Sequence, residues 1–399
     1  MNQGKATLVL DFGNSETRGI LLFGRDATTG KLRERAFRLS NRFNEVEEGF
    51  VLPQDYDEET STVLRVEGTA NGAVVSGMYV NGEVQQKEYN VAPIRPSAIE
   101  KKYNAITTVM SYELAVLHAY KAIQRMLRTS SITELDITWD IVVLLPPGDV
   151  DLGREKMVEL IKSVGCVDAT YPQVRMPITV NRITVLPEGF CAYIGAVYDR
   201  GKVIRKEMEY LTKEVTLVCD IGAGTTDILI VSKGGVINTS KFTINRGGNN
   251  VIQLVRSALR AEGITLSETE IAEGIINGYV RDGVKTFDLT EILAKAKKEI
   301  AQQLVADMQG YLEETQFPIR SIARILVCGG GAMSSENSKS LGDSILEYLR
   351  KLAPNVELVE LPFHEILTPD EDGVMHKEKV RISPRDLNVL GASIFGEMY

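Results

Sequence analysis

Histidine and cysteine are scarce in this chain, which holds three histidines and four cysteines among its 399 residues. The cysteines, Cys166, Cys191, Cys219 and Cys328, lie far apart, mostly beside apolar residues, and form no Cys-x-x-Cys pair. This pattern predicts reduced thiols in a hydrophobic core rather than a zinc site or a disulfide framework. Three histidines are also too few for a dense imidazole metal site.

Long hydrophobic runs and a surplus of basic residues are missing as well. Runs such as IVVLLPP are too short to cross a bilayer, and MNQGKATLVLDFG lacks the apolar stretch of a signal peptide. The formal net charge of -9 and the isoelectric point near 5.2 argue against direct binding to nucleic acid or to an anionic membrane. We expect a cytoplasmic protein, whose 44% hydrophobic content suffices for two medium domains or one fold of two lobes.

An apolar run, a glycine-rich turn and a second apolar run follow one another in VTLVCDIGAGTTDILIV, residues 215–231. The pattern predicts two strands joined by a tight loop. Gly222 and Gly224 lack the Cβ atoms that would hold a bulky anion away from the backbone, and the two threonines that follow add hydroxyl donors. Asp220, at the end of the first strand, is placed to meet a hydrated Mg²⁺. For a single loop of this kind, a turn without a ligand is the alternative.

The same pattern occurs a second time, near the start of the chain. TLVLDFGNSETRG aligns with TLVCDIGAGTTDI at an offset of 209, which is 220 minus 11. The shared positions are Thr7 and Thr216, Leu8 and Leu217, Val9 and Val218, Asp11 and Asp220, Gly13 and Gly222, and Thr17 and Thr226. This agreement predicts two related halves, each with one loop and one carboxylate for a polyphosphate.

The two hairpins resemble the phosphate loops of the actin, heat-shock chaperone and sugar kinase superfamily of ATPases. Three later segments follow in the order of that superfamily: a Pro-Glu before GFCAYIGAVYD, the strand and triple glycine of RILVCGGGAMSSEN, and ISPRDLNVLGASIFG. The resemblance implies an α/β protein with a bilobed actin-like ATPase fold, in which two duplicated RNase H-like domains each carry an insertion subdomain. Strands and helices alternate over residues 105–187, which independently predicts a parallel sheet.

The predicted first lobe covers residues 1–214, with a mostly β insertion at about 31–104 in which Asn81-Gly82 is read as a hairpin signal. Its end, from Asp199 to Glu214, is charged and is predicted to be a solvated link. The second lobe covers residues 215–399, with a helical insertion at about 262–320. A C-terminal helix at about 384–399 is predicted to return to the hinge between the lobes, with Gly391-Ala392 as its close-packing face.

A long helix is predicted over AITTVMSYELAVLHAYKAIQRML, and another over LTEILAKAKKEIAQQLVADMQGYLEET. The apolar stripe of the first comprises Met110, Leu114, Leu117, Tyr120, Ile123 and Leu127. Ser267 and Glu270 have the spacing of a capping box. On the second long helix, Lys295, Lys297 and Lys298 are predicted to form a solvated face.

Glu188 stands at or near a helix start. An acidic residue there complements the helix dipole and needs no catalytic role. By the resemblance, however, it supplies the carboxylate that orients the attacking water, a role for which a hydrogen-bond acceptor beside the γ-phosphate is suited. The resemblance thus gives three catalytic residues, Glu188, Asp220 and Asp11, of which Asp11 and Asp220 hold Mg²⁺ through water.

The resemblance also implies a nucleotide site for ATP or ADP, with GTP left open. Its residues are Gly13, Asn14, Ser15, Thr17, Arg18, Gly222, Ala223, Gly224, Thr225, Thr226, Asp227, Gly247, Gly248, Lys298, Glu299, Gly329, Gly330, Gly331 and Ala332. Arg18 replaces the lysine of relatives, keeping the charge but changing the donor geometry. The turn at Gly247-Gly248 can equally be an ordinary turn before a helix, with no ligand and with Asn249 or Asn250 as the helix cap.

The length and the small first insertion look like bacterial or phage actin homologues of the plasmid-segregation (ParM) type. That likeness implies an ATPase that forms head-to-tail filaments with itself and moves or positions DNA through a separate DNA-binding adaptor protein. The alternative is a soluble kinase or activator with the same ATP clamp. A kinase needs a base aimed at a substrate hydroxyl, and the sequence singles out no second carboxylate for that role.

Overall fold

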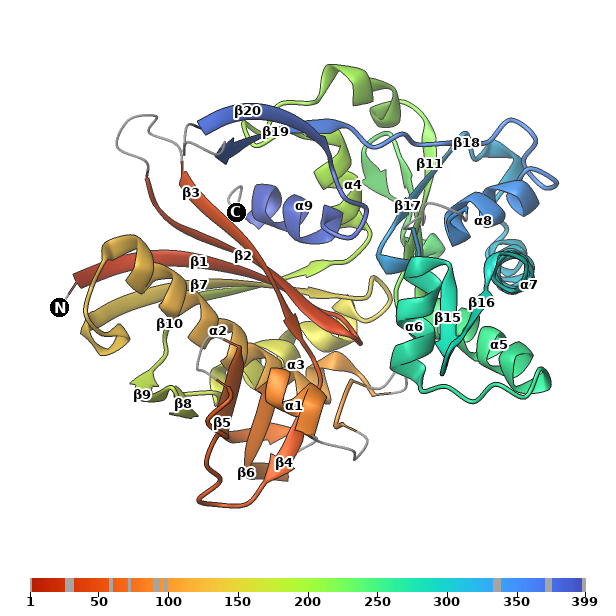
Figure 1. The fold of residues 1–399 in the computed structure, drawn as a ribbon. Helices are drawn as coiled ribbons and strands as arrows, with labels where there is room; N and C mark the ends of the chain where they lie inside the picture. The colour runs from red at the N-terminus through yellow and green to blue at the C-terminus, as the bar shows by residue number, and fades with distance from the viewer. Residues whose placement is uncertain are drawn as a thin grey trace. The chain divides into compact units, whose positions relative to one another are not determined.

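The computed structural model describes residues 2–25, 32–56, 60–70, 73–88, 93–96, 100–332, 339–369 and 375–396. The chain divides into two compact units (Figure 1). The first unit comprises Met1–Leu145, Asp149–Pro187 and Phe395–Tyr399, and the second comprises Pro146–Gly148 and Glu188–Ile394. No helix in the described part of the chain combines the length and the hydropathy that a membrane span requires.

The main sheet of the first unit has five strands in the order β10-β7-β1-β2-β3. They are β1 (Asn2–Phe12), β2 (Glu16–Arg25), β3 (Leu32–Ser40), β7 (Leu135–Leu145) and β10 (Thr179–Pro187). The β1–β2 hairpin is antiparallel, whereas β7 runs parallel to β1 and β10 parallel to β7. Strand β7 is almost wholly buried, as expected for the middle of a parallel sheet covered by helices.

The second unit repeats this arrangement. Its six strands follow the order β13-β12-β11-β17-β18, with β14 also paired to β12. They are β11 (Val215–Ile221), β12 (Thr226–Ser232), β13 (Gly235–Val236), β14 (Phe242–Ile244), β17 (Arg324–Cys328) and β18 (Glu357–Leu358). An antiparallel hairpin is again followed by two parallel neighbours. The two halves are therefore related in topology as well as in sequence, which confirms the predicted duplication.

The helices fall where the apolar periodicity predicts them. In the first unit these are α2 (Ile106–Leu127) and α3 (Val150–Ser163). The stripe of α2 is buried up to Ile123, whereas Leu127 at its last turn is 38% exposed. In the second unit, the order along the chain is α4 (Phe190–Val197), α5 (Gly248–Ala261), α6 (Glu268–Asn277), α7 (Thr290–Glu314), α8 (Leu341–Leu349) and α9 (Leu387–Gly396). The capping box of Ser267 and Glu270 opens α6, as predicted.

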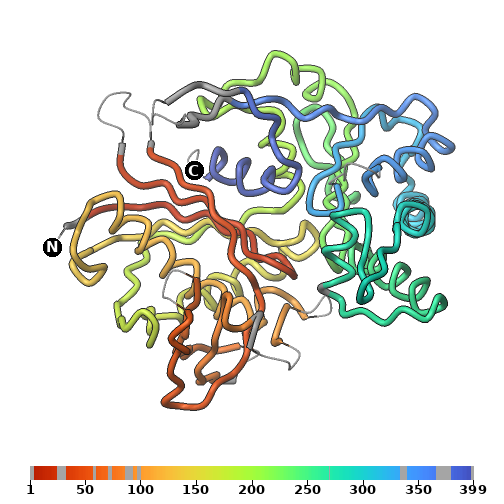
Figure 2. The backbone as a smooth tube through the Cα atoms, viewed as in Figure 1, coloured from red at the N-terminus to blue at the C-terminus, as the bar shows by residue number. Residues whose placement is uncertain are grey.

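The insertion of the first unit differs from the prediction in its limits and its partners. Residues 32–40 are β3 and belong to the main sheet. The insertion builds a second sheet in the order β4-β6-β5-β8-β9, to which β8 (Cys166–Tyr171) and β9 (Gln173–Pro177) come from much later in the sequence. Figure 2 shows this yellow-green segment beside the red and orange strands of the insertion. The period of two identifies a strand but not its neighbour, so the later strands could not be assigned from pattern.

The hairpin of this insertion also lies elsewhere than predicted. Strands β5 (Ser61–Ala70) and β6 (Ala73–Gly82) pair from Ala70 and Ala73 outward, so the connection falls on residues 71–72, outside the described residues. The predicted signal, Asn81-Gly82, instead ends β6. Gly82 takes a positive φ of 98°, and α1 (Glu83–Glu88) follows at once. The remaining strand of this sheet is β4 (Asn44–Val46).

The insertion of the second unit is helical except for one hairpin. Strands β15 (Tyr279–Asp282) and β16 (Lys285–Asp288) lie between α6 and α7, where the sequence predicted only helices. Each strand has four residues, too few for a clear alternating pattern.

A second hairpin is formed by β19 (Phe363–Pro369) and β20 (Met375–Arg381). Short 3₁₀ turns are η1 (Lys102–Asn104), η2 (Ile132–Glu134), η3 (Lys206–Thr212), η4 (Asn238–Ser240), η5 (Ile319–Ser321) and η6 (Gly330–Ala332).

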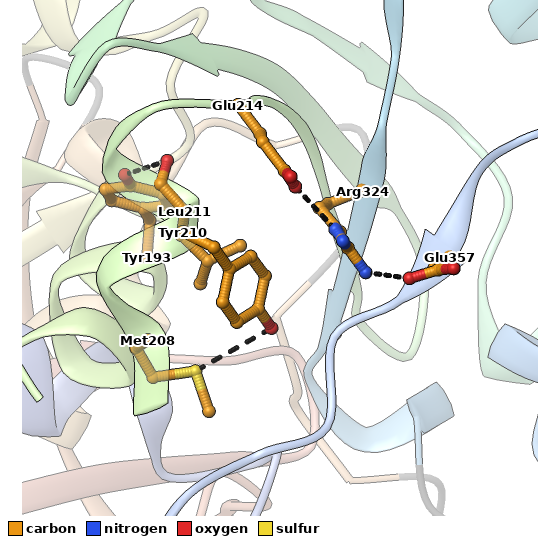
Figure 3. A network of polar contacts seen from close by, with 7 residues as sticks. All are labelled: Tyr193, Met208, Tyr210, Leu211, Glu214, Arg324 and Glu357. Carbon is orange, nitrogen blue, oxygen red and sulfur yellow. Dashed lines mark hydrogen bonds and ion pairs between the residues drawn. The ribbon is translucent and has the colours of Figure 1, made fainter. Parts of the chain in front are cut away.

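The predicted boundary between Glu214 and Val215 does not coincide with the division between the units, which falls after Pro187. The segment read as a solvated link is packed on the second unit, since Met208 and Leu211 are buried. The Tyr193 hydroxyl in α4 donates to the Leu211 carbonyl oxygen at 2.9 Å (Figure 3). Beside it, Arg324 at the start of β17 contacts Glu214 at 2.5 Å and also pairs with Glu357. Because most residues of this segment are charged or polar, its composition did not indicate that Met208 and Leu211 are buried.

Candidate functional site

The two glycine-rich loops close with the same turn. The Gly13 amide donates to the Glu16 carbonyl oxygen at 3.0 Å, and the Gly222 amide donates to the Thr225 carbonyl oxygen at 2.9 Å. In both hairpins the last paired residue before the turn faces a threonine, Thr17 or Thr226, whose side chain is fully buried. Each loop thus has the shape that the sequence alignment predicted.

A buried asparagine holds the loop of the first unit. The Asn41 side chain donates to the Gly13 carbonyl oxygen at 2.6 Å and accepts a hydrogen bond from the Thr17 hydroxyl at 2.7 Å. The backbone amide of Asn41 donates to the Ser15 carbonyl oxygen at 3.1 Å. The Ser111 hydroxyl of α2 donates to Asn41 Oδ1 at 2.9 Å. The Thr17 hydroxyl, predicted to contact phosphate, therefore serves to fix the loop. Asn14 and Ser15 lie on its partly exposed and exposed parts.

Two basic side chains lie at the same end of this hairpin. Lys102 Nζ lies 3.6 Å from Asp11 Oδ1, and Arg18 contacts Glu16 Oε1 at 2.5 Å. Lys102 belongs to η1, which is anchored by Lys101 on Asp149 at 2.7 Å. The sequence analysis missed Lys102, because its position beside Asp11 arises only when the insertion folds back on β1.

The loop of the second unit is seated on the turn before α5. The amides of Gly248 and Asn249 donate to the carbonyl oxygens of Gly222 and Ala223, at 3.0 and 2.7 Å. A Cβ on Gly247 would lie 2.5 Å from the Gly222 oxygen, so this contact requires glycine. The Gly-Gly turn therefore does more than lead into a helix, because it supports the glycine loop. The helix cap is Gly247, with the Asn250 side chain accepting a hydrogen bond from its amide at 2.8 Å.

The last two residues predicted in this loop are engaged within the fold. Thr226 donates to the Arg246 carbonyl oxygen at 2.7 Å, and Thr243 donates to Asp227 Oδ1 at 2.5 Å. Both Thr226 and Asp227 are buried. Residues Gly222 to Thr225 are only half-buried, so they form the accessible part of the loop.

Asp220 is the point at which four segments of the second unit meet. Its Oδ2 accepts a hydrogen bond from Asn388 Nδ2 of α9 at 2.5 Å, and the Asn388 Oδ1 accepts one from the Gly189 amide at 2.9 Å. A Cβ on Gly329 would collide with Asp220 Oδ1. Asp220, Asn388 and Glu188 are 6%, 5% and 5% exposed. Asn388 thus ties the predicted catalytic residue Asp220 to the backbone next to Glu188, the other predicted catalytic residue of the second unit.

The triple glycine packs against the end of β11. Gly329 has a positive φ of 79°, and its amide donates to the Pro384 carbonyl oxygen at 3.1 Å. A Cβ on Gly331 would collide with the Ile221 side chain. Gly330 and Ala332 belong to η6, and residues 333–338 of the predicted polar helix start lie outside the described residues. Close packing against β11 thus requires glycine at 329 and 331, whereas a Cβ on Gly330 would meet no atom closer than 3.8 Å.

The face of α7 that was predicted to be solvated is only partly so. Lys298 and Glu299 are exposed, whereas Lys297, predicted to be on the solvated face, is buried. Lys297 Nζ donates to the Lys339 carbonyl oxygen at 2.7 Å, and burial lowers the pKa of its ammonium group. The helical spacing of Leu293, Ala296, Lys297 and Ile300 places Lys297 on the core face. The prediction for Lys297 was therefore wrong.

The carboxylates suit a Mg²⁺ ion that keeps most of its water. Within the described residues, no three His, Cys, Asp or Glu side chains gather into a metal cage. Asp220 is held in place by Asn388, and the half-buried loop beside it is open to a phosphate. Mg²⁺ commonly binds through one or two carboxylates plus phosphates and water, so the Asp220 carboxylate of the second unit and the Asp11 carboxylate of the first unit are each of the kind that holds it as an outer ligand.

Comparisons with known proteins agree with this geometry. Residues 218–338 match the family model described as archaeal actin homologue MreB-like, C-terminal. A search of curated proteins found no significant match. Among solved structures, this chain resembles Alp7A, an actin-like protein, at 16% identity and a TM-score of 0.66, covering 100% of this chain and 97% of that chain.

Two further structures resemble it over similar lengths. Ta0583, an archaeal actin homolog, has 13% identity and a TM-score of 0.65, covering 99% of this chain and all of that one, and its complex with ADP has a TM-score of 0.59. A 15-stranded ParM filament from Clostridium botulinum has 15% identity and a TM-score of 0.60, covering 99% and 100% of the chains. The duplicated Asp-x-Gly hairpins, the repeated sheet and these likenesses lead to one conclusion: the chain has the actin-like fold.

Proposed function

We propose that this protein is a Mg²⁺-dependent ATPase that polymerises into filaments in a nucleotide-dependent way. The observation that carries the proposal is the network in which Asp220, Asn388 and the Glu188-Gly189 corner are joined beside a half-buried glycine loop. A loop of this kind accepts phosphate, and a buried carboxylate next to it orients water or metal. The ADP complex of Ta0583 supports nucleotide binding by this fold.

In the proposed reaction, Asp11 and Asp220 would hold Mg²⁺ through water, and the ion would supply positive charge to offset that of the phosphates. Glu188 accepts a hydrogen bond from the attacking water and directs its lone pair at the γ-phosphorus. The loop residues from Ala223 to Thr225 present their backbone amides, and Thr225 also its hydroxyl, to the phosphates, while the Gly222 amide closes the turn on the Thr225 carbonyl oxygen. Asn388 holds Asp220, and Lys102 offsets the charge of Asp11.

The hydrolysis step is tested with Glu188→Ala. We expect nucleotide affinity to stay within about threefold of wild type, while turnover falls by at least about 100-fold, because only the placement of water is lost. Isothermal titration and phosphate release measure the two quantities. Glu209→Ala is a suitable control, since Glu209 is exposed and pairs only locally with Lys213. If Glu188→Ala keeps wild-type turnover, Glu188 has no catalytic role and only complements the helix dipole.

The filament is proposed from the likeness to ParM and Alp proteins, one of which is a 15-stranded filament. Identical subunits joined head to tail grow without symmetry closure. The net charge of -9 suits a polymer that positions plasmid or phage DNA through a basic adaptor protein. Sedimentation and electron microscopy with ATP or a slowly hydrolysed analogue, over a range of protein concentrations, test assembly. A protein that hydrolyses ATP but stays monomeric throughout would instead be a soluble kinase or activator.

A further inference from the structure

We infer that Asn388 is a positioning residue, which ties the metal-side carboxylate Asp220 to the corner that carries Glu188. The inference rests on the proposed function, because it concerns the same site. It goes further in assigning a task to a buried residue of α9 that acts through Asp220 and the Gly189 amide. Both ends of the Asn388 carboxamide are used: the nitrogen donates to Asp220 Oδ2 at 2.5 Å and the oxygen accepts from the Gly189 amide at 2.9 Å.

The corner at Gly189 depends on this support. Gly189 has a positive φ of 67°, and a Cβ there would lie 2.9 Å from the Leu229 side chain. The next amide, of Phe190, bonds back to the Glu188 carbonyl oxygen at 2.6 Å, so the chain turns sharply from β10 into α4. Because Asn388 holds the amide next to Glu188, a shift of Asn388 also shifts the base of the Glu188 side chain.

Asn388 is itself held firmly. A Cβ on Gly195 of α4 would lie 2.5 Å from the Leu387 carbonyl oxygen, and one on Gly391 would collide with the carbonyl oxygen of Cys191. The two helices are thus in backbone contact on either side of Asn388. A carboxamide in such surroundings keeps one orientation, since its buried donor and acceptor lose both hydrogen bonds if the side chain turns away.

The consequence is a link between the two catalytic carboxylates. Asp220 is placed to sense Mg²⁺ and phosphate, and Glu188 orients water; Asn388 makes the position of one depend on the position of the other. Displacements near 1 Å at a reacting centre can cost about 100-fold in rate without a similar loss of binding. The residue therefore affects turnover much more than affinity.

The test compares Asn388→Ala with Asn388→Asp and a control on the same helix. Asn388→Ala loses both hydrogen bonds. Asn388→Asp has nearly the same shape and keeps an acceptor for the Gly189 amide, but it replaces the donor to Asp220 by a second carboxylate that repels it. Ser393→Ala is the matched control, because buried Ser393 of α9 bonds to Arg200 and to the Leu390 carbonyl oxygen and not to Asp220.

We expect ATP turnover to fall about 10- to 100-fold in both Asn388 variants, with ADP affinity within about threefold of wild type. Ser393→Ala should keep wild-type turnover. Turnover in both Asn388 variants equal to that of Ser393→Ala would overturn the inference, as would a loss of ADP affinity with unchanged turnover. Phosphate release and ADP titration provide these values.

Hydrogen exchange at the Gly189 amide gives a second readout that needs no nucleotide. We expect exchange at least about tenfold faster in Asn388→Ala than in wild type, and near-wild-type exchange in Asn388→Asp. Equal protection in all variants contradicts the inference even if the wild-type protein is an active ATPase. A wild-type protein that fails to hydrolyse ATP refutes the proposed function, and the exchange result then still decides whether Asn388 fixes the corner.

Discussion

At the scale of single residues, the buried carboxyl group of Glu113 gives the stability of the protein a pH dependence. Glu113 lies in α2, is 1% exposed, and its Oε1 accepts a hydrogen bond from the Asp168 amide at 2.8 Å. Burial, reinforced by the nearby carboxylates of Asp168 and Glu67, raises its pKa to about 8. The folded protein therefore holds this proton more tightly than the unfolded chain does.

Because the folded pKa is the higher one, the contribution of Glu113 to stability is full below about pH 4.5 and is lost as the pH rises toward 8. Replacing Glu113 by Gln keeps an oxygen acceptor for Asp168 and removes the ionisation. We expect Glu113→Gln to be more stable than wild type by about 3 kcal/mol at pH 7, with the difference vanishing near pH 4.5.

Urea unfolding at several pH values between 4.5 and 8 measures this difference. The exposed Glu155→Gln in α3 is the control and should show a small, pH-independent change. A constant difference between Glu113→Gln and wild type across this range would mean that Glu113 is ionised in the folded protein.

The sequence predicts the glycines and carboxylates of the site but not the amides that hold them. Asp11, Asp220 and their glycines are recognised because each hairpin is local and occurs twice. Asn41 and Asn388 act across 28 and 168 positions of the chain, and neither asparagine stands in a local pattern that indicates its distant partner. Lys102 escaped notice for the same reason.

At the scale of elements, the backbone contact between α4 and α9 leaves no room for a side chain at Gly391 or Gly195. A methyl group on Gly391 would occupy the place of the Cys191 carbonyl oxygen. We therefore expect Gly391→Ala to lower the free energy of unfolding by about 3 kcal/mol, at the upper end of overpacking effects. Thermal or urea unfolding measures the change.

Gly310 provides the matched control. It lies within α7, is exposed, and has no atom within 4 Å of an added Cβ. Gly310→Ala should stabilise the protein by about 0.5 to 1 kcal/mol, because alanine has the higher helix propensity. If both substitutions change stability alike, the two helices are farther apart than described.

The sequence indicates which segments are strands more clearly than it indicates which strands pair with one another. Residues 32–40 read as part of the insertion because they follow a charged turn region, yet they pair with β2 along its length. Strands β8 and β9 join a sheet whose other members precede them by about a hundred residues, since pairing is decided by the tertiary fold. The short β15–β16 hairpin lacked a pattern of its own.

At the scale of the whole molecule, nucleotide binding should appear as added stability. A ligand that binds only the folded state stabilises it by about 2.7 kcal/mol at a concentration of 100 Kd. We expect ADP with Mg²⁺ to raise the melting temperature of the wild-type protein and to have little effect on Asp220→Ala. Exposed Asp307→Ala, which loses only its contact with Arg246, should behave as wild type. An equal rise in Asp220→Ala would exclude Asp220 from the nucleotide site.

The duplication made the architecture predictable as a whole. Two copies of one motif at an offset of 209, which is 220 minus 11, predicted two sheets of the same topology, and both sheets are found. The division between the units was misplaced, because hydrophilic composition suggested a link where Met208 and Leu211 are in fact buried.

The hydrogen bond between Asp220 and Asn388 also sets an order of events during synthesis. The ribosome makes Asp220 168 positions before Asn388, an interval of roughly 10 to 30 seconds at ordinary elongation rates. During that time the β11–β12 hairpin can form, but its carboxylate has no amide from α9 to hold it. A nascent chain thus acquires the glycine loop early, whereas the contact that holds Asp220 against α9 forms only after nearly all of the second unit has been made.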